Sequence, residues 1–179
     1  MKKIILTVFA ASSLLLYSTP SFALLSVSVG SPLGYNFTEG GTNSNTEGYF
    51  LGVQLPFALG LGMDSHKLKS DTGSTELHTN MYNLFYQLPI PVINLILGVG
   101  TGSQEYICDD TGRGLSCSDA LDKGSATQFY TSLGIPIIPL FDFHISYRMI
   151  TSKNIKWKGT ENKLDTSGSL LGAGIAFNF

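Results

Sequence analysis

The sequence Ser167-Gly168-Ser169-Leu170-Leu171-Gly172-Ala173-Gly174-Ile175-Ala176-Phe177-Asn178-Phe179 ends the chain and alternates with a period of two. One set of alternate positions turns apolar and then aromatic: Ser169, Leu171, Ala173, Ile175, Phe177 and Phe179. The other set is mostly small: Gly168, Leu170, Gly172, Gly174, Ala176 and Asn178. This alternation predicts a β-strand rather than a helix. An exposed apolar edge strand is a liability in water, whereas in a closed membrane barrel such a strand pairs with the first one and leaves no edge.

The start of the chain predicts export from the cytoplasm. Lys2 and Lys3 supply positive charge, Ile4 to Leu16 form an apolar run, and Ser21-Phe22-Ala23 is a small-x-small cleavage site. These are the parts of a secretory signal peptide, and the run is too short to span a membrane as a helix. We therefore expect residues 1–23 to be a signal peptide that is removed and residues 24–179 to form one domain. A retained anchor helix is the alternative.

Charge is scarce and confined to short segments. Only 13% of the residues are charged, against about 25% in soluble domains. Without Lys2 and Lys3, nine basic residues oppose 13 acidic ones, a mild balance that gives no reason to expect a nucleic-acid partner. Between the charged segments lie charge-free windows, none of them apolar for long enough to form a spanning helix. These windows are residues 24–38, 48–63, 77–104, 124–141 and 166–179.

The windows divide into alternating segments with the length of tilted transmembrane strands, about 9–11 residues. Long polar connections alternate with short turns that contain prolines. The long connections are residues 38–47, 69–76, 103–125 and 151–166, and the turn prolines are Pro56, Pro89, Pro91, Pro136 and Pro139. The fold class predicted from this arrangement is all-β: an eight-stranded antiparallel up-and-down transmembrane β-barrel.

Alternation also predicts which side chains face lipid. Large apolar side chains are expected outside, and glycine and polar side chains are expected in the lumen. In the first segment we expect Leu33 and Tyr35 outside and Asn36 inside, with a bulge or kink at Pro32 because proline cannot donate to the strand ladder. A soluble lipocalin-like barrel, the alternative, would reverse the two faces. The inward positions here hold too many glycines and polar residues to fill a dry core.

Five charged or titratable side chains are expected inside the barrel: Asp64, His66, Asp142, His144 and Arg148. Charge at membrane depth requires a polar lumen and a partner. The first interpretation is a salt-bridge and hydrogen-bond network that plugs and stiffens the barrel, with Asp64 and Arg148 as the preferred pair. The second is a gated polar path. An eight-stranded lumen is nearly filled by side chains, but we expect the inward glycines to leave room for water pockets.

The longest connection contains the two cysteines, Cys108 and Cys117. An exported chain meets oxidising conditions, so we expect a disulfide between them that pins this loop. Metal binding by the cysteines and nearby aspartates is the alternative. It is disfavoured because no histidine lies near, and we predict no metal site and no cofactor.

The signal peptide, the eight alternating segments and the ending Gly174-Ile175-Ala176-Phe177-Asn178-Phe179 resemble small bacterial outer-membrane barrels of the OmpA/OmpX type. The resemblance covers the whole mature chain, in pattern rather than in an identifying motif. It implies a monomer in the outer membrane of a Gram-negative bacterium, in contact with outer-membrane lipid. It also implies that Phe177 and Phe179 belong to the signal read by the barrel-assembly machinery. No peptidoglycan-binding domain follows the barrel, so anchoring to the cell wall is not expected.

The predicted role is structural or one of surface interaction, in adhesion or envelope integrity, through the four long loops. The alternative is a narrow porin-like channel for small or apolar solutes, similar to the OmpW-like group. An enzymatic alternative comes from His144-Ile145-Ser146, which is similar to the His-x-Ser of PagL-type lipid A deacylases. That motif continues with Asn and faces lipid, whereas here Tyr147 follows and alternation turns both side chains inward. We therefore predict no enzyme activity and no catalytic residues.

Overall fold

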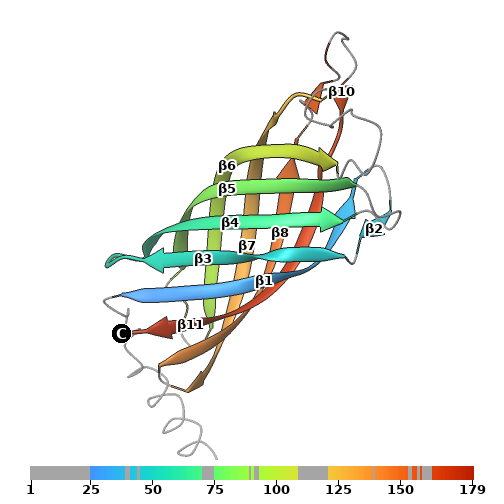
Figure 1. The fold of residues 1–179 in the computed structure, drawn as a ribbon. Helices are drawn as coiled ribbons and strands as arrows, with labels where there is room; N and C mark the ends of the chain where they lie inside the picture. The colour runs from blue at the N-terminus through green and yellow to red at the C-terminus, as the bar shows by residue number, and fades with distance from the viewer. Residues whose placement is uncertain are drawn as a thin grey trace, which may run out of the picture.

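The computed structural model describes residues 25–38, 41–43, 45–69, 75–88, 90, 93–108, 121–138, 140–152, 155–156, 158 and 163–179. These residues form a closed antiparallel β-barrel (Figure 1). Its long strands are β1 (Ser26–Phe37), β3 (Thr46–Gln54), β4 (Leu59–Lys69), β5 (Thr75–Leu88), β6 (Asn94–Cys108), β7 (Gly124–Ile138), β8 (Phe141–Thr151) and β11 (Gly168–Asn178). Short strands β2 (Thr42–Asn43), β9 (Ile155–Lys156) and β10 (Lys163–Leu164) lie between them. The predicted eight-stranded up-and-down barrel is confirmed; the expected signal peptide lies outside the described residues.

The last strand closes the barrel against the first. β11 pairs with β1 from Ser26 opposite Asn178 to Phe37 opposite Gly168. Beyond the ladder, the Phe179 amide donates to the carbonyl of Leu25 at 2.8 Å. The apolar edge that the sequence presents at its end is therefore paired, as membrane barrels require.

The two ends of the barrel differ, and we name them by their connections. At the turn end, short connections join β3 to β4, β5 to β6 and β7 to β8, and the chain termini of the barrel lie there (Figure 1). At the loop end lie the long connections. Strands β6 and β7 extend further into the expected 103–125 loop than predicted, to Cys108 and from Gly124. The 151–166 connection contains the β9–β10 hairpin.

The outside of the wall is apolar around the whole barrel. Alternate positions on successive strands carry aliphatic side chains that expose between 41% and 55% of their surface: Leu51, Leu84, Val99, Ile135, Ile145 and Ile175. A contiguous apolar surface of this kind is unfavourable in water and suits hydrocarbon. Among the described residues, no helix is long and apolar enough to cross a bilayer.

The β1 strand contains the predicted irregularity at Pro32. Pro32 faces Gly172 and Gly34 faces Leu171, so Leu33 is an inserted residue without a partner. A single inserted residue moves every later side chain to the opposite face. The prediction for Tyr35 and Asn36 was therefore wrong. Tyr35 points inward with no exposed surface, and its hydroxyl donates to the carbonyl of Thr166 at 2.8 Å, whereas Asn36 is exposed.

The loop-end half of the lumen is filled by packed side chains, most of them apolar, which the sequence analysis did not predict. The core joins inward side chains from most wall strands with Ile155 of the β9–β10 hairpin. Its buried members are Tyr35, Phe50, Leu68, Leu77, Met81, Ala126, Ile150, Ile155 and Leu170. Lumen side chains of this size fill an eight-stranded barrel. Polar side chains are buried in this half as well: Gln104 Nε2 donates to Thr79 Oγ1 at 3.0 Å, and Thr166 Oγ1 donates to Gln104 Oε1 at 2.6 Å.

Three inward glycines lie directly against aromatic rings that point into the lumen. A Cβ on Gly98 would lie 2.2 Å from the Tyr130 ring, and a Cβ on Gly172 would lie 2.4 Å from the Phe50 ring. A Cβ on Gly60 would lie 2.1 Å from the Phe85 ring. At these positions the expectation that glycine leaves free space was wrong, because a bulky side chain from another strand occupies it.

Candidate functional site in the barrel lumen

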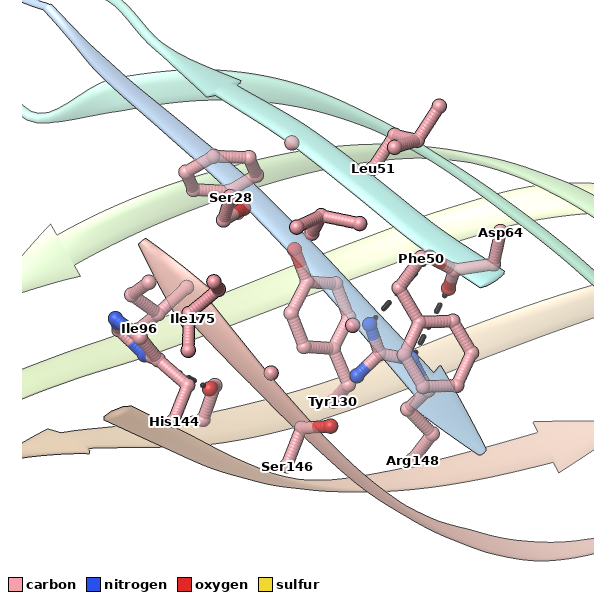
Figure 2. A pocket seen from close by; sticks show the side chains of 16 residues that line it. Ser28, Phe50, Leu51, Asp64, Ile96, Tyr130, His144, Ser146, Arg148 and Ile175 are labelled. Atoms are coloured by element: carbon pink, nitrogen blue, oxygen red, sulfur yellow. Dashed lines mark hydrogen bonds and ion pairs between the residues drawn. The ribbon is translucent and has the colours of Figure 1, made fainter. Parts of the chain in front are cut away.

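Arg148 lies at the centre of the lumen, between two aromatic rings and a carboxylate. Its guanidinium carbon is 3.8 Å from the centre of the Phe50 ring and 4.6 Å from the centre of the Tyr130 ring. Its Nε donates to Asp64 Oδ2 at 3.1 Å, and its Nη2 donates to Asp64 Oδ1 at 3.4 Å (Figure 2). Arg148 comes from β8 and Asp64 from β4, so the ion pair ties strands that are not neighbours in the wall.

Asp64 has a further donor beside the arginine. Gln128 Nε2 donates to Asp64 Oδ2 at 2.7 Å and lies 2.9 Å from Asn83 Oδ1. A Cβ on Gly100 would lie 2.0 Å from that Asn83 oxygen, so the network uses space left by a glycine. A buried charge is tolerated when it is paired and its remaining hydrogen-bonding capacity is met. Both conditions hold for Asp64.

A second polar group closes the turn end of the lumen around Asp142. The Oδ2 atom of Asp142 accepts hydrogen bonds from the side-chain amides of Asn94 and Asn178, the latter at 2.9 Å. Gln87 Nε2 donates in turn to Asn94 Oδ1 at 2.6 Å. Asp142 is 3% exposed. These side chains come from β5, β6, β8 and β11, and together they close the turn end of the lumen.

His144 lies beside this group without a hydrogen bond to Asp142. Its Nδ1 lies 3.3 Å from Ser132 Oγ, within hydrogen-bonding distance. Its Nε2 lies 3.9 Å from Asp142 Oδ2, which is too long for a hydrogen bond. A serine–histidine–carboxylate relay needs both hydrogen bonds, and the described geometry supplies only the first. Ser146, which the sequence analysis paired with His144, is buried in the lumen.

His66 stands apart from the other predicted members. It is buried beside the rings of Tyr35 and Phe50, at 6.3 and 6.5 Å between ring centres. Neither ring nitrogen has a hydrogen-bond partner within the described part of the chain. The five predicted residues therefore form an Asp64–Arg148 group, an Asp142–His144 group and an isolated His66, rather than one network.

A pocket of about 60 Å³ lies between the Arg148 and His144 layers (Figure 2). Hydroxyls of Ser28, Ser132 and Ser146 and the side chains of Phe85 and Ile96 line it. Both Arg148 and His144 also line the pocket, and each has one buried nitrogen without a partner among the described residues. A space of this size and polarity accommodates a few water molecules that can bond such nitrogens.

The remaining predicted site residues lie at the two ends. Cys108 ends β6, with Sγ 3.7 Å from Thr75 Oγ1, and Cys117 lies outside the described residues, so the disulfide stays a prediction. Phe177 packs against Phe141 at 4.5 Å between ring centres, and Phe179 is 67% exposed at the turn end. No group of three His, Cys, Asp or Glu side chains suited to a metal occurs among the described residues.

Four residues of the central network were absent from the predicted site: Phe50, Asn83, Gln128 and Tyr130. Alternation places all four inward, so the signal for their location was present. What the sequence does not give is which inward side chains meet across the lumen. That depends on the stagger of the strands around the barrel.

No protein-family model matches the sequence, and no curated protein matches it. Solved structures do match over most of the chain. Neisserial surface protein A has a TM-score of 0.62 and 14% identity, covering 87% of this chain and 96% of that chain. The N-terminal β-barrel domain of Pseudomonas aeruginosa OprF has a TM-score of 0.54 and 14% identity, covering 86% and 97%.

The chain has the fold of the small outer-membrane β-barrels. A third match is Ail, the attachment invasion locus protein of Yersinia pestis, in complex with the heparin analogue sucrose octasulfate. Its TM-score is 0.51 at 13% identity, covering 87% of this chain and 96% of that chain. At these identities the likeness concerns the fold and not the role of the protein.

Proposed function

We propose that the protein is an integral barrel of the bacterial outer membrane that presents its loops to the outside and does not conduct. The observation that carries this proposal is the packed core across the loop-end half of the lumen. Tyr35, Met81 and Leu170 have no exposed surface there, and Ile150 is 2% exposed. No water-filled path runs along side chains that water does not touch. A narrow channel, the alternative, needs such a path.

Planar-bilayer recordings of the purified protein test this proposal. We expect no steady channel events from the wild type, because the apolar core excludes hydrated ions. A Tyr35→Ala/Leu170→Ala variant, which removes two fully buried side chains of that core, is expected to show openings and serves as the positive control. Steady wild-type conductance at the level of this variant would contradict the closed lumen and favour transport.

The proposal assigns no catalytic role to the barrel and treats it as a monomer. His144 Nε2 lies 3.9 Å from Asp142 Oδ2, which is too far for the hydrogen bond that would orient the ring for catalysis. We also propose that the barrel-assembly machinery inserts the protein and reads Phe177 and Phe179 as the signal. This part rests on the resemblance in the terminal strand.

A specific observation favours a polyanion as the ligand of the loops. Lys156 of β9 and Lys163 of β10 lie directly opposite each other in the hairpin. Like charges at such a pair destabilise a hairpin, and a bound anion would relieve the repulsion. The 151–166 segment contains four lysines against two acidic residues, whereas the chain as a whole is acidic. Ail, with the same fold, is solved in complex with a heparin analogue.

Heparin-affinity chromatography of the detergent-solubilised protein tests the polyanion. We expect Lys156→Glu/Lys163→Glu to elute at lower salt, with affinity reduced about tenfold if each lysine–anion contact is worth about 0.7 kcal/mol. Lys67→Glu/Lys69→Glu is the matched control, because these lysines are paired with Glu47 at 3.3 and 2.6 Å. Equal losses in both double variants would contradict a specific role for the hairpin.

A further inference from the structure

The turn between β3 and β4 combines backbone strain with an exposed aromatic ring. Phe57 and Ala58 have φ of 76° and 65°, the left-handed region that asparagine and glycine adopt most readily. Phe57 is also 90% exposed. In water, a phenylalanine at position 57 would strain the backbone, and its exposed ring would add no stability. An environment that favours the ring would account for it.

The other described residues of the turn end have the same character. Ile137, Ile138 and Leu140, at the connection of β7 to β8, are 67%, 53% and 58% exposed. No Asp, Glu, Lys or Arg occurs in the sequence of the three short turns, residues 54–59, 88–94 and 136–141. Asp142 is buried inside the lumen. The outer surface of the barrel at this end therefore has no charged side chain to hold it in water.

The height of the apolar wall points the same way. On β4, outward positions run from Leu59 through Leu61, Met63 and Ser65 to Lys67, the first charge on that face. The eight residue-to-residue steps from Leu59 to Lys67 rise about 27 Å along a strand, or about 20 Å along the membrane normal at the tilt of such barrels. The apolar band of outer-membrane barrels is about 25 Å tall. The missing few ångströms lie beyond Leu59, where Phe57 projects.

We infer that the turn end is embedded in the inner leaflet of the membrane, with Phe57 and the side chains of Ile137, Ile138 and Leu140 among the lipid tails near the headgroups. The surface is continuous with the lipid-facing wall, its three short turns have no charged side chain, and it adds to the apolar height of the strands. Lipid is thus the occupant that these observations favour over a periplasmic protein. The inference rests on the proposed membrane location and adds that recognition is confined to the loop end.

Depth-dependent fluorescence quenching tests this inference. Trp157 is the only tryptophan of the chain, so a Trp157→Phe background allows one reporter at a time. Phe57→Trp and Leu140→Trp are placed in nanodiscs whose lipids carry bromine at defined depths. We expect both reporters to be quenched most by bromine near the headgroups and to be shielded from aqueous iodide. Two reporters on different turns keep the test valid if one variant fails to fold.

Two reference variants in the same background separate the possible failures. Ile175→Trp, on the lipid-facing wall, should be quenched most by deep bromine; its failure would overturn the membrane location itself. Lys158→Trp, exposed at the loop end, sets the iodide quenching of a water-exposed site. Turn reporters quenched by iodide as strongly as Lys158→Trp, and untouched by bromine, would overturn the embedding while Ile175→Trp still reports lipid. That outcome would show that the side chains of the turn end are exposed to water.

Discussion

Replacing Arg148 with methionine is expected to lower the free energy of unfolding by about 3–5 kcal/mol, because it leaves the Asp64 carboxylate buried without its charge partner. Asp64 is 1% exposed and would keep only its hydrogen bond from Gln128. Methionine preserves much of the apolar volume between Phe50 and Tyr130, which limits the contribution of a cavity. Urea unfolding in lipid vesicles, followed by the heat-dependent shift in electrophoretic mobility, measures the change.

The double variant Asp64→Asn/Arg148→Met is the control for this prediction. Removing both charges abolishes the unpaired carboxylate, so about 2 kcal/mol of the loss should be regained. Additive losses in the two single variants and the double variant would show that Asp64 and Arg148 do not depend on each other. The lumen would then be stabilised by packing alone.

Leu170→Ala is expected to cost about 2–5 kcal/mol, because it opens a cavity in the apolar core of the lumen. Leu170 has no exposed surface and belongs to the core that includes Met81 and Ile150. The neighbouring residue offers a matched comparison. Leu171, on the same strand, points outward and is 44% exposed.

Leu171→Ala should cost about 2 kcal/mol at most, since lipid chains close over the lost methyl groups and only the transfer free energy is forfeited. The same unfolding assay compares the two variants. A Leu171→Ala cost equal to or above that of Leu170→Ala would show that the loop-end lumen is not tightly packed. It would also remove the main support for a non-conducting barrel.

The outward-facing side chains of most strands were predictable, because the alternation that places them depends only on residues two positions apart in the sequence. Leu51, Leu84, Ile145 and Ile175 face outward as predicted, and the closing pair of strands follows from the apolar last strand. The exception is Tyr35. A bulge shifts the alternation by one residue, and the presence of Pro32 predicts an irregularity without saying how many residues it inserts.

The lumen was less predictable, since its contacts join residues far apart in sequence. Alternation turned Arg148 and Asp64 inward, and their 3.1 Å contact arises because the strands place them at the same height. The same reasoning grouped His66 and His144 with them, whereas neither histidine hydrogen-bonds to that pair among the described residues. At Gly60, Gly98 and Gly172 the expected free space is filled by the rings of Phe85, Tyr130 and Phe50, which come from other strands.

By itself the sequence determined that this chain forms strands, how many, and which face of most of them is apolar, because these properties depend on residues two positions apart. Only the tertiary structure decided how the lumen is divided. The stagger of the strands decides which inward side chains meet, as it does where Arg148 contacts Asp64 and Phe50, and no local pattern encodes that stagger. Whether side chains block the lumen therefore depends on the register of the strands, and it could not be predicted from composition.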